Sequence, residues 1–556
     1  MPGVGLSLQS FAADLFLANP HLFYTVWWFG SLLLIIMLLL LLIASVALQD
    51  CHRIPVWAVV GIGMLAMIFC RFPSLFYGES STDESQWLAS VITIMADPVF
   101  YFKEFYLYDI GRSLTIIPLW FVAELGFSVD YGLAKLTGIL CWLTFYFFYY
   151  LLIRDLLGKK TAVISSTVLC GYLATFSAYG QIAYNSETPT LVFLISFLFF
   201  FYKSIQIKNK MWPFLAGFFL AASFFAKLQS LYILMASGIF SSFFYLSKNH
   251  KKNLLIFVVG GVFCVILFAF PYALYPDELL HVFYEVLNHT QNGILDNNFS
   301  LVDKIKIIYL NPRDSYQLVS ILLMAFSLIS SKSRKFIFCL FCERRIMMLL
   351  FAIFYAASSY TVLSPQDYFM HYGLYMVLPS ALIMAVSINA IISTHGKLIS
   401  LLLVSVAFLV VVRVGMHRSG YEFHANVREL PRYQTPFGKI ISKYAEPGYR
   451  MIILGWDSGL HIETGLLRGS RYWYAAFLNR GYPEEYKMKV LERYYRDIEE
   501  YRPEIIVELS GRSNVIPSFV FQLDDFPELK IFIQKRYDLV FQSNKRKVFL
   551  LKRADH

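Results

Sequence analysis

Two adjacent acidic residues, Asp83 and Glu84, stand shortly after an apolar stretch that is long enough to cross a lipid bilayer. A carboxylate in this position could act as a general base that takes the proton of an attacking hydroxyl group. It would have to lie within ~3 Å of that oxygen. The pair could instead be an exposed turn that caps a helix starting near Ser85, because Asp is a favoured N-cap residue. Both interpretations are compatible with the local sequence.

Charged side chains elsewhere could complete a site for a phosphate-bearing substrate. Arg112 follows in the same predicted loop, and its guanidinium group could bind phosphate oxygens through several N–H donors or simply cap a helix. Lys227 lies in an apolar stretch, where a charge is costly and usually functional, although the side chain could also reach the interface.

The elements that must position these residues are transmembrane helices. Of the 556 residues, 57% are hydrophobic and only 15% are charged, whereas an ordinary soluble domain carries about 25% charged residues. The net charge of +10 reflects basic residues in alternate short connectors, as the positive-inside rule predicts for cytoplasmic loops. The composition therefore predicts an α-helical polytopic membrane protein with lipids as partners, and it gives no reason to expect nucleic acid.

Hydropathy predicts about twelve spans and an external N terminus. We place them at 29–48, 55–76, 132–153, 161–179, 188–206, 211–226, 228–247, 254–275, 315–331, 345–363, 373–393 and 397–414. The stretch 211–247 could also form one long helix, but the distribution of basic residues favours two. The apolar segment 114–127 is too short to span the bilayer and predicts a helix along the membrane surface.

The chain divides into a transmembrane domain, 1–414, with long external loops at 77–131 and 276–314, and a small external domain, 415–556. The second domain is expected to be α/β. Its predicted elements are strands at 450–455 and 503–509, a helix at 484–501 and a closing hairpin over 537–551. No disulfide framework, metal site or cofactor is expected from the cysteines or from the acidic and histidine residues of the loops.

The order of these features resembles the C-type (GT-C) multi-pass glycosyltransferases, including protein O-mannosyltransferases and lipid A aminoarabinose transferases. The resemblance rests on Asp83-Glu84 after an external helix end, the Gly-rich segment from Gly217 to Lys227, and the segment from His371-Tyr372 to Pro379. The chain departs from the family where Gly111-Arg112-Ser113-Leu114 replaces a Lys-Pro-Pro-Leu element, and where His371 replaces an Arg. It also has an additional N-terminal span.

This resemblance implies a hexosyl- or pentosyltransferase that uses a polyprenyl-phosphate-linked sugar without a metal and inverts the anomeric centre. Asp83 would be the base, and Glu84 would position it or bind the sugar. Arg112, Lys227 and His371 would hold the phosphate, with Asp109, Glu187 and Tyr372 also lining the substrate site. The acceptor would be a glycan, lipid or protein of the cell envelope. The implied location is the bacterial inner membrane, with the C-terminal domain on the periplasmic or extracellular side.

Two other functions have sequence signatures that can be compared with this chain. A lipid-linked glycan ligase or polymerase would share the donor, but should lack the early acidic pair and place catalytic Arg or His in a large central loop. A secondary transporter would show internal repeats with helices broken at matching places, and the sequence shows no such symmetry. A transferase accounts best for the early acidic pair that Arg112 follows.

Overall fold

The computed structural model describes most of the chain. The described residues are 7, 14, 18–48, 55–76, 82–106, 110–175, 183–273, 300–306, 315–365, 370–428, 435–472, 475–478, 484–512 and 520–552. Of the predicted external loop at 276–314, only the turns around α15 (Leu301–Ile305) fall within this part. The remainder of that loop lies outside the described residues.

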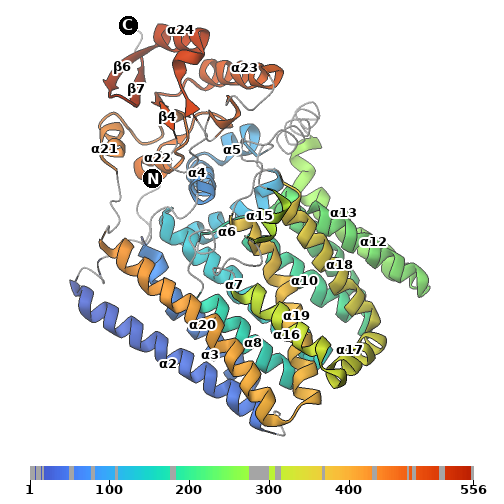
Figure 1. The fold of residues 1–556 in the computed structure, drawn as a ribbon. Helices are drawn as coiled ribbons and strands as arrows, with labels where there is room; N and C mark the ends of the chain where they lie inside the picture. Colours follow the sequence, from blue (N-terminus) through green and yellow to red (C-terminus); the bar gives the residue numbers. More distant parts are fainter. Residues whose placement is uncertain are drawn as a thin grey trace.

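Long apolar helices form a bundle that occupies the first three quarters of the chain (Figure 1). Its helices are α2 (Pro20–Ala47), α3 (Val56–Arg71), α7 (Tyr131–Leu157), α8 (Lys159–Thr175), α10 (Glu187–Gln206), α11 (Met211–Ala226), α12 (Leu231–Ser247), α13 (Lys251–Ala273), α16 (Ser315–Ile329), α17 (Ser331–Glu343), α18 (Arg345–Leu363), α19 (Val377–Thr394) and α20 (Lys397–Arg428). In the described part, nine helical segments are long and apolar enough to cross a membrane. The predicted polytopic membrane fold is confirmed.

The count is lower than the expected twelve because three of the expected spans are not single long apolar helices. Helices α16 and α17 meet at an angle of 102°, and together they would make a tenth span. Helix α11 is apolar but has only 16 residues. Helix α8 is buried from Thr161 to Thr175, so it packs inside the bundle and carries Ser and Thr where a lipid-facing helix would be apolar.

Helices α11 and α12 are separate, so 211–247 is not one continuous helix. The break falls at Lys227, whose φ of −156° and ψ of 124° are extended, and the short 3-10 turn η4 (Leu228–Ser230) follows it. The charged residue in the middle of this apolar stretch is thus the point where the backbone leaves the helical conformation.

Three helices follow α3 and lie between the bundle and the C-terminal domain (Figure 1). They are α4 (Thr82–Ala96), α5 (Pro98–Glu104) and α6 (Ser113–Glu124), with the 3-10 turn η3 (Ile110–Arg112) before α6. Asp83 and Glu84 occupy the first turn of α4, where the helix dipole favours negative charge. Helix α6 coincides with the apolar helix expected over 114–127.

The C-terminal domain is α/β, as predicted. Its five-stranded sheet has the order β2-β1-β3-β7-β6, in which β1 pairs in parallel with β2 and β3, and β7 pairs antiparallel with β3 and β6. The strands are β1 (Arg450–Leu454), β2 (Leu467–Arg468), β3 (Ile505–Leu509), β6 (Tyr537–Gln542) and β7 (Arg546–Leu551), and the helices are α21 (Pro436–Ser442), α22 (Gly459–Thr464), α23 (Glu484–Tyr501) and α24 (Pro527–Arg536). A two-stranded sheet pairs β4 (Gly511–Arg512) with β5 (Val520–Phe521).

The domain and the α4–α6 layer share one hydrophobic core. Trp87 and Leu88 of α4 belong to the same buried cluster as Ile452 of β1, Tyr494 of α23 and Ile506 of β3. The division of the chain at residues 414 and 415 stays a prediction, and helix α20 continues past it to Arg428. The helix that carries Asp83 is therefore packed against the C-terminal domain.

Candidate active site

Asp83 faces residues from two other parts of the membrane domain. His371, in the 3-10 turn η7 (Met370–Met376), places its Nε2 atom 3.7 Å from Oδ2 of Asp83 and 3.8 Å from Oε1 of Glu187. Glu187 is the first residue of α10 and is fully buried, whereas the Asp83 side chain keeps 23% of its surface exposed. Three residues that the sequence analysis selected separately are thus neighbours, and Asp83 is the accessible carboxylate among them.

Lys227 joins the same cluster from the break between α11 and η4. Its ammonium group forms an ion pair with Oε1 of Glu187 and lies 4.8 Å from the centre of the Tyr372 ring. The other oxygen of Glu187, Oε2, is buried and makes no hydrogen bond within the described part of the chain. Glu187 is thus a buried carboxylate that pairs with the Lys227 ammonium group through one oxygen and leaves its other oxygen open as an acceptor. This pairing can orient Lys227 toward an additional ligand.

Helix α6 and turn η3 hold Lys227 in place from both sides. The Thr115 hydroxyl donates a hydrogen bond of 2.8 Å to the carbonyl of Ala226, the residue before Lys227. Gly111 lies so close to Leu228, the residue after Lys227, that a Cβ atom on Gly111 would be 2.2 Å from the leucine Cγ. The Gly111-Arg112 element is therefore shaped to pack against the break that presents Lys227.

Arg112 lies on the same side of α4 as Asp83. Its guanidinium carbon is 5.4 Å from the centre of the Trp87 ring. Trp87 is four residues after Asp83 on α4, so the two side chains share one helix face. The guanidinium group of Arg112 therefore contacts the helix that bears Asp83.

Glu84 differs from its neighbour because it is completely buried. Lys135 of α7, also completely buried, places its Nζ atom 2.6 and 2.5 Å from the two carboxylate oxygens. The backbone N–H of Tyr184 donates a further hydrogen bond of 2.7 Å to Oε1 of Glu84. Glu84 therefore ties the first turn of α4 to α7 and to the segment before α10, and its geometry suits positioning better than contact with a sugar.

Most of the predicted site residues come together. Asp83, Glu187, Lys227, His371 and Tyr372 form one cluster, and Arg112 contacts Trp87 on the helix that bears Asp83, whereas Asp109 is outside the described residues. Lys135 is not among the residues predicted from the sequence, although a lysine inside the predicted span 132–153 is a signal of the same kind as Lys227. The residues of the C-terminal domain that contact α4 are also missing from that prediction, because no local motif exists for them.

The C-terminal domain contacts the first turn of the helix that bears Asp83. The hydroxyl oxygens of Ser85 and Ser458 are 2.6 Å apart, and Ser458 lies in the turn after β1. Arg468 of β2 is almost completely buried and donates a hydrogen bond of 2.9 Å from Nη1 to the Ser90 hydroxyl of α4. Its backbone N–H donates to Oγ1 of Thr93 over 3.2 Å. The domain therefore holds α4 along its length.

Replacing Arg468 with alanine is expected to loosen α4 from the C-terminal domain. The change leaves Ser90 and the carbonyl of Arg471 without a buried donor, at a cost of at least about 2 kcal/mol. Hydrogen exchange of the α4 amides should become faster than in the wild type. Arg496→Ala is the control, because Arg496 is exposed on α23 and its side chain makes no contact with α4 within the described part of the chain. Equal exchange in both variants would contradict the role of Arg468.

Asp457, beside Ser458, is expected to destabilise the domain at neutral pH. Burial, reinforced by the charge of Glu463, raises the pKa of Asp457 from its ordinary value of 3.8 to about 6. Because the folded state holds this proton more tightly than the unfolded chain, the stabilisation is complete below about pH 4 and is lost as the pH rises to about 6. At pH 7, Asp457→Asn should therefore increase the free energy of unfolding by up to about 3 kcal/mol.

The test compares thermal unfolding of the C-terminal domain in the full chain at pH 4 and pH 7. The advantage of Asp457→Asn should vanish at pH 4, where the wild-type carboxyl is already neutral. Burial lowers the pKa of His461 to about 4, and this opposite effect cancels because His461 is present in both proteins. A difference of the same size at both values of pH would refute the assignment.

Solved structures of other proteins resemble the fold of this chain, whereas sequence comparisons find no match. No protein-family model matches the chain, and no curated protein matches it by sequence. The crystal structure of ArnT from Cupriavidus metallidurans bound to undecaprenyl phosphate superposes with a TM-score of 0.57 at 11% identity, over 89% of this chain and 97% of ArnT. An oligosaccharyltransferase from Archaeoglobus fulgidus gives 0.46 at 14% identity, over 81% of this chain and 67% of its own. Arabinosyltransferase EmbB from Mycobacterium smegmatis gives 0.41 at 13% identity, over 76% and 45%.

The chain therefore has the fold of the GT-C membrane glycosyltransferases, and it is a multi-pass integral membrane protein. This conclusion rests on the ArnT structure, because the match extends over nearly the whole of both chains. At this level of identity the similarity establishes the fold, and the chemistry depends on the residues of this chain.

Proposed function

We propose that this protein transfers a sugar from a polyprenyl-phosphate donor to a hydroxyl group of a glycan, lipid or protein acceptor. The main support for the proposal is that Asp83, an accessible carboxylate, lies in one cluster with Lys227 and His371 in a GT-C fold. A base and cationic groups within a few ångströms of each other are what a hydroxyl acceptor and a phosphate leaving group require together. ArnT, of the same fold, was crystallised with undecaprenyl phosphate, which supports this class of donor.

In the proposed reaction, Asp83 accepts the proton of the acceptor hydroxyl as its oxygen attacks the anomeric carbon. The bond between that carbon and the phosphate oxygen breaks, and its electron pair stays on the phosphate. Attack from the face opposite the leaving group inverts the anomeric centre. The phosphodiester becomes a monoester with one more negative charge, so the site must stabilise charge that develops on the phosphate.

Lys227, Arg112 and His371 are the groups that we assign to this phosphate. Lys227 is only 14% exposed and its partner Glu187 is fully buried, so the ammonium group acts where water screens charge weakly. Glu187 keeps the ammonium oriented, and the ring of Tyr372 covers one side of it. We assign Asp109 to the substrate site on the resemblance alone.

The buried pair of Glu84 and Lys135 is assigned a positioning role. It fixes the first turn of α4 and hence the direction in which Asp83 points. We place the reaction on the external face of a bacterial inner membrane, with the C-terminal domain on the same side. Basic connectors at the other ends of the helices support this orientation.

The proposal is tested with the purified full chain in nanodiscs, which is offered a panel of polyprenyl-phosphate hexoses and pentoses. Release of free polyprenyl phosphate is followed with and without a chelator and with a mixture of envelope glycans and lipids as acceptors. We expect acceptor-dependent release from one donor class that the chelator leaves unchanged. Release that stops with the chelator would refute metal independence, and no release from any donor would refute the donor class.

A further inference from the structure

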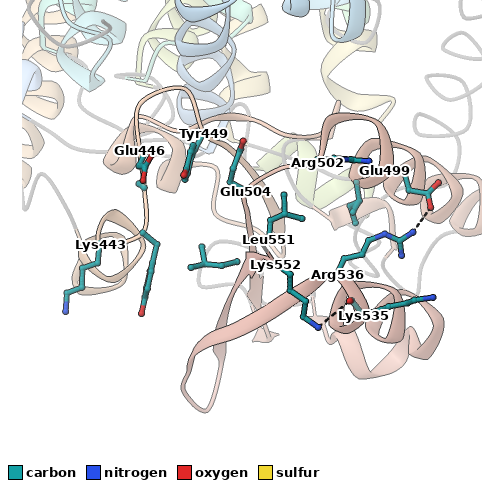
Figure 2. Close-up of a pocket in the computed structure, with 14 residues that line it drawn as sticks. Lys443, Glu446, Tyr449, Glu499, Arg502, Glu504, Lys535, Arg536, Leu551 and Lys552 are labelled. Atoms are coloured by element: carbon teal, nitrogen blue, oxygen red, sulfur yellow. Dashed lines mark hydrogen bonds and ion pairs between the residues drawn. The ribbon is translucent and has the colours of Figure 1, made fainter. Parts of the chain in front are cut away.

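A groove of about 910 Å³ lies in the C-terminal domain, away from the Asp83 cluster (Figure 2). It opens at the amino ends of the parallel strands β1 and β3, where Tyr449 and Glu504 stand. Ser458, which contacts the active-site helix, follows the carboxyl end of β1. The contacts of α4 run from Ser85 at that end to Asp97 beside Arg450, so the groove and Asp83 are separated by about the length of α4, roughly 20 Å.

The lining of the groove combines apolar, aromatic and charged side chains. Leu551 lies in the middle of the view in Figure 2, with Tyr449 and Glu446 on one side and Arg536 on the other. The lining includes five cationic residues and three carboxylates, so it carries an excess of positive charge. Within the described part of the chain, the side chains of Lys443, Arg502 and Lys535 make no hydrogen bond or ion pair. These cations are available to a ligand.

Arg502 provides an independent indication that the groove binds something. It directly follows the last residue of α23, and its φ of +43° is in the left-handed region. Glycine is the usual residue at this position after a helix, because a side chain with this backbone conformation is strained. Arg502 is exposed and has no side-chain partner among the described residues, so contacts within this part of the chain do not offset the conformational cost of its backbone.

We propose that this groove is a second binding site and that it takes an anionic saccharide, that is, a sugar bearing carboxylate or phosphate groups. Arginine and lysine bind such anions with charge-assisted hydrogen bonds. The rings of Tyr444 and Tyr449 and the apolar floor suit the C–H faces of sugar rings, and Glu446 and Glu504 can accept hydrogen bonds from hydroxyl groups. The site is distinct from the proposed transferase centre, and its ligand can be identified without any turnover.

The experiment measures binding to the full chain in nanodiscs of neutral phosphatidylcholine. The probes are tetragalacturonate as a carboxylated glycan, glucose 1-phosphate as the sugar phosphate of a glycolipid headgroup, and uncharged maltotetraose as the comparison. We expect saturable binding of at least one anionic probe and none of maltotetraose. The anionic probe that binds shows whether the ligand is a glycan chain or a lipid headgroup.

The substitution Arg502→Gly distinguishes an effect on ligand binding from an effect on folding. Glycine adopts the left-handed backbone conformation at this position without strain, so the substitution should not destabilise the domain. The unfolding temperature of the domain should stay the same or rise, while affinity for the anionic probe falls roughly tenfold or more with the loss of a charge-assisted hydrogen bond. Arg496→Ala removes the same charge from an exposed position on α23 outside the groove and should bind like the wild type. Unchanged affinity in Arg502→Gly, equal binding of maltotetraose, or no binding of either anionic probe would overturn the proposal.

Discussion

Asp83→Asn is expected to lower turnover by roughly 10²- to 10⁴-fold, the usual contribution of a general base. Asparagine keeps the shape of the side chain but cannot take the proton of the acceptor hydroxyl. The fold should be retained, because Asp83 is partly exposed and the buried anchor of this turn is Glu84. Donor binding should stay the same or become tighter, since a negative charge that repels the phosphate is removed.

Two measurements check this prediction. Release of polyprenyl phosphate reports turnover, and equilibrium binding of polyprenyl phosphate reports the donor site. The matched control is Glu124→Gln, which neutralises an exposed carboxylate on α6 whose side chain accepts a hydrogen bond from Trp120. Loss of donor binding in Asp83→Asn, or turnover that survives the substitution, would remove Asp83 from the role of base.

Lys135→Met is expected to destabilise the membrane domain by about 3–5 kcal/mol, the cost of leaving a buried charge without its partner. Glu84 would keep its hydrogen bond from the Tyr184 N–H but lose the cation that contacts both of its oxygens. Methionine fills a similar volume, so the effect reflects charge and not a cavity. Lys208→Met is the control, because Lys208 is exposed in the connector after α10.

The double variant Glu84→Gln with Lys135→Met distinguishes an ion pair from two separate losses. With both charges removed, it should be at least about 2 kcal/mol more stable than the sum of the two single effects predicts. Glutamine can still accept the hydrogen bond from Tyr184, so the first turn of α4 stays anchored. Unfolding free energies of the four proteins in one detergent give the coupling, and strictly additive effects would argue against a direct interaction.

Much of the fold could be predicted from the sequence. The thickness of the bilayer sets the length of the membrane-spanning helices, and the pattern of apolar side chains indicates whether a segment is a helix or a strand. Apolar length located α2, α7 and α13, and short continuous apolar runs located the buried strands β1 and β3. Hydropathy could not distinguish a lipid-facing span from α8, which is buried among other helices. It also could not predict the 102° bend between α16 and α17, since both segments are helical and only their junction differs.

The residues of the candidate site that could be predicted from the sequence are charged residues that interrupt an apolar stretch or follow one. Lys227 and Asp83 have this signature, and they belong to one cluster in the structure. Lys135 has the same signature, but its partner Glu84 lies 51 residues away and only the packing of α4 against α7 joins them. The contacts of Arg468 and Ser458 with α4 connect positions more than 370 residues apart, and no periodicity within the chain encodes them.

The cluster of Asp83, Lys227 and His371 is proposed to bind the phosphate group of a polyprenyl carrier. A structure of the full chain in nanodiscs with bound polyprenyl phosphate tests this proposal most directly. We expect phosphate density within hydrogen-bonding distance of Lys227 and His371, with the Asp83 carboxylate facing the position of the missing sugar. Phosphate bound elsewhere, with Lys227 and His371 in contact only with Glu187 and Asp83, would contradict it.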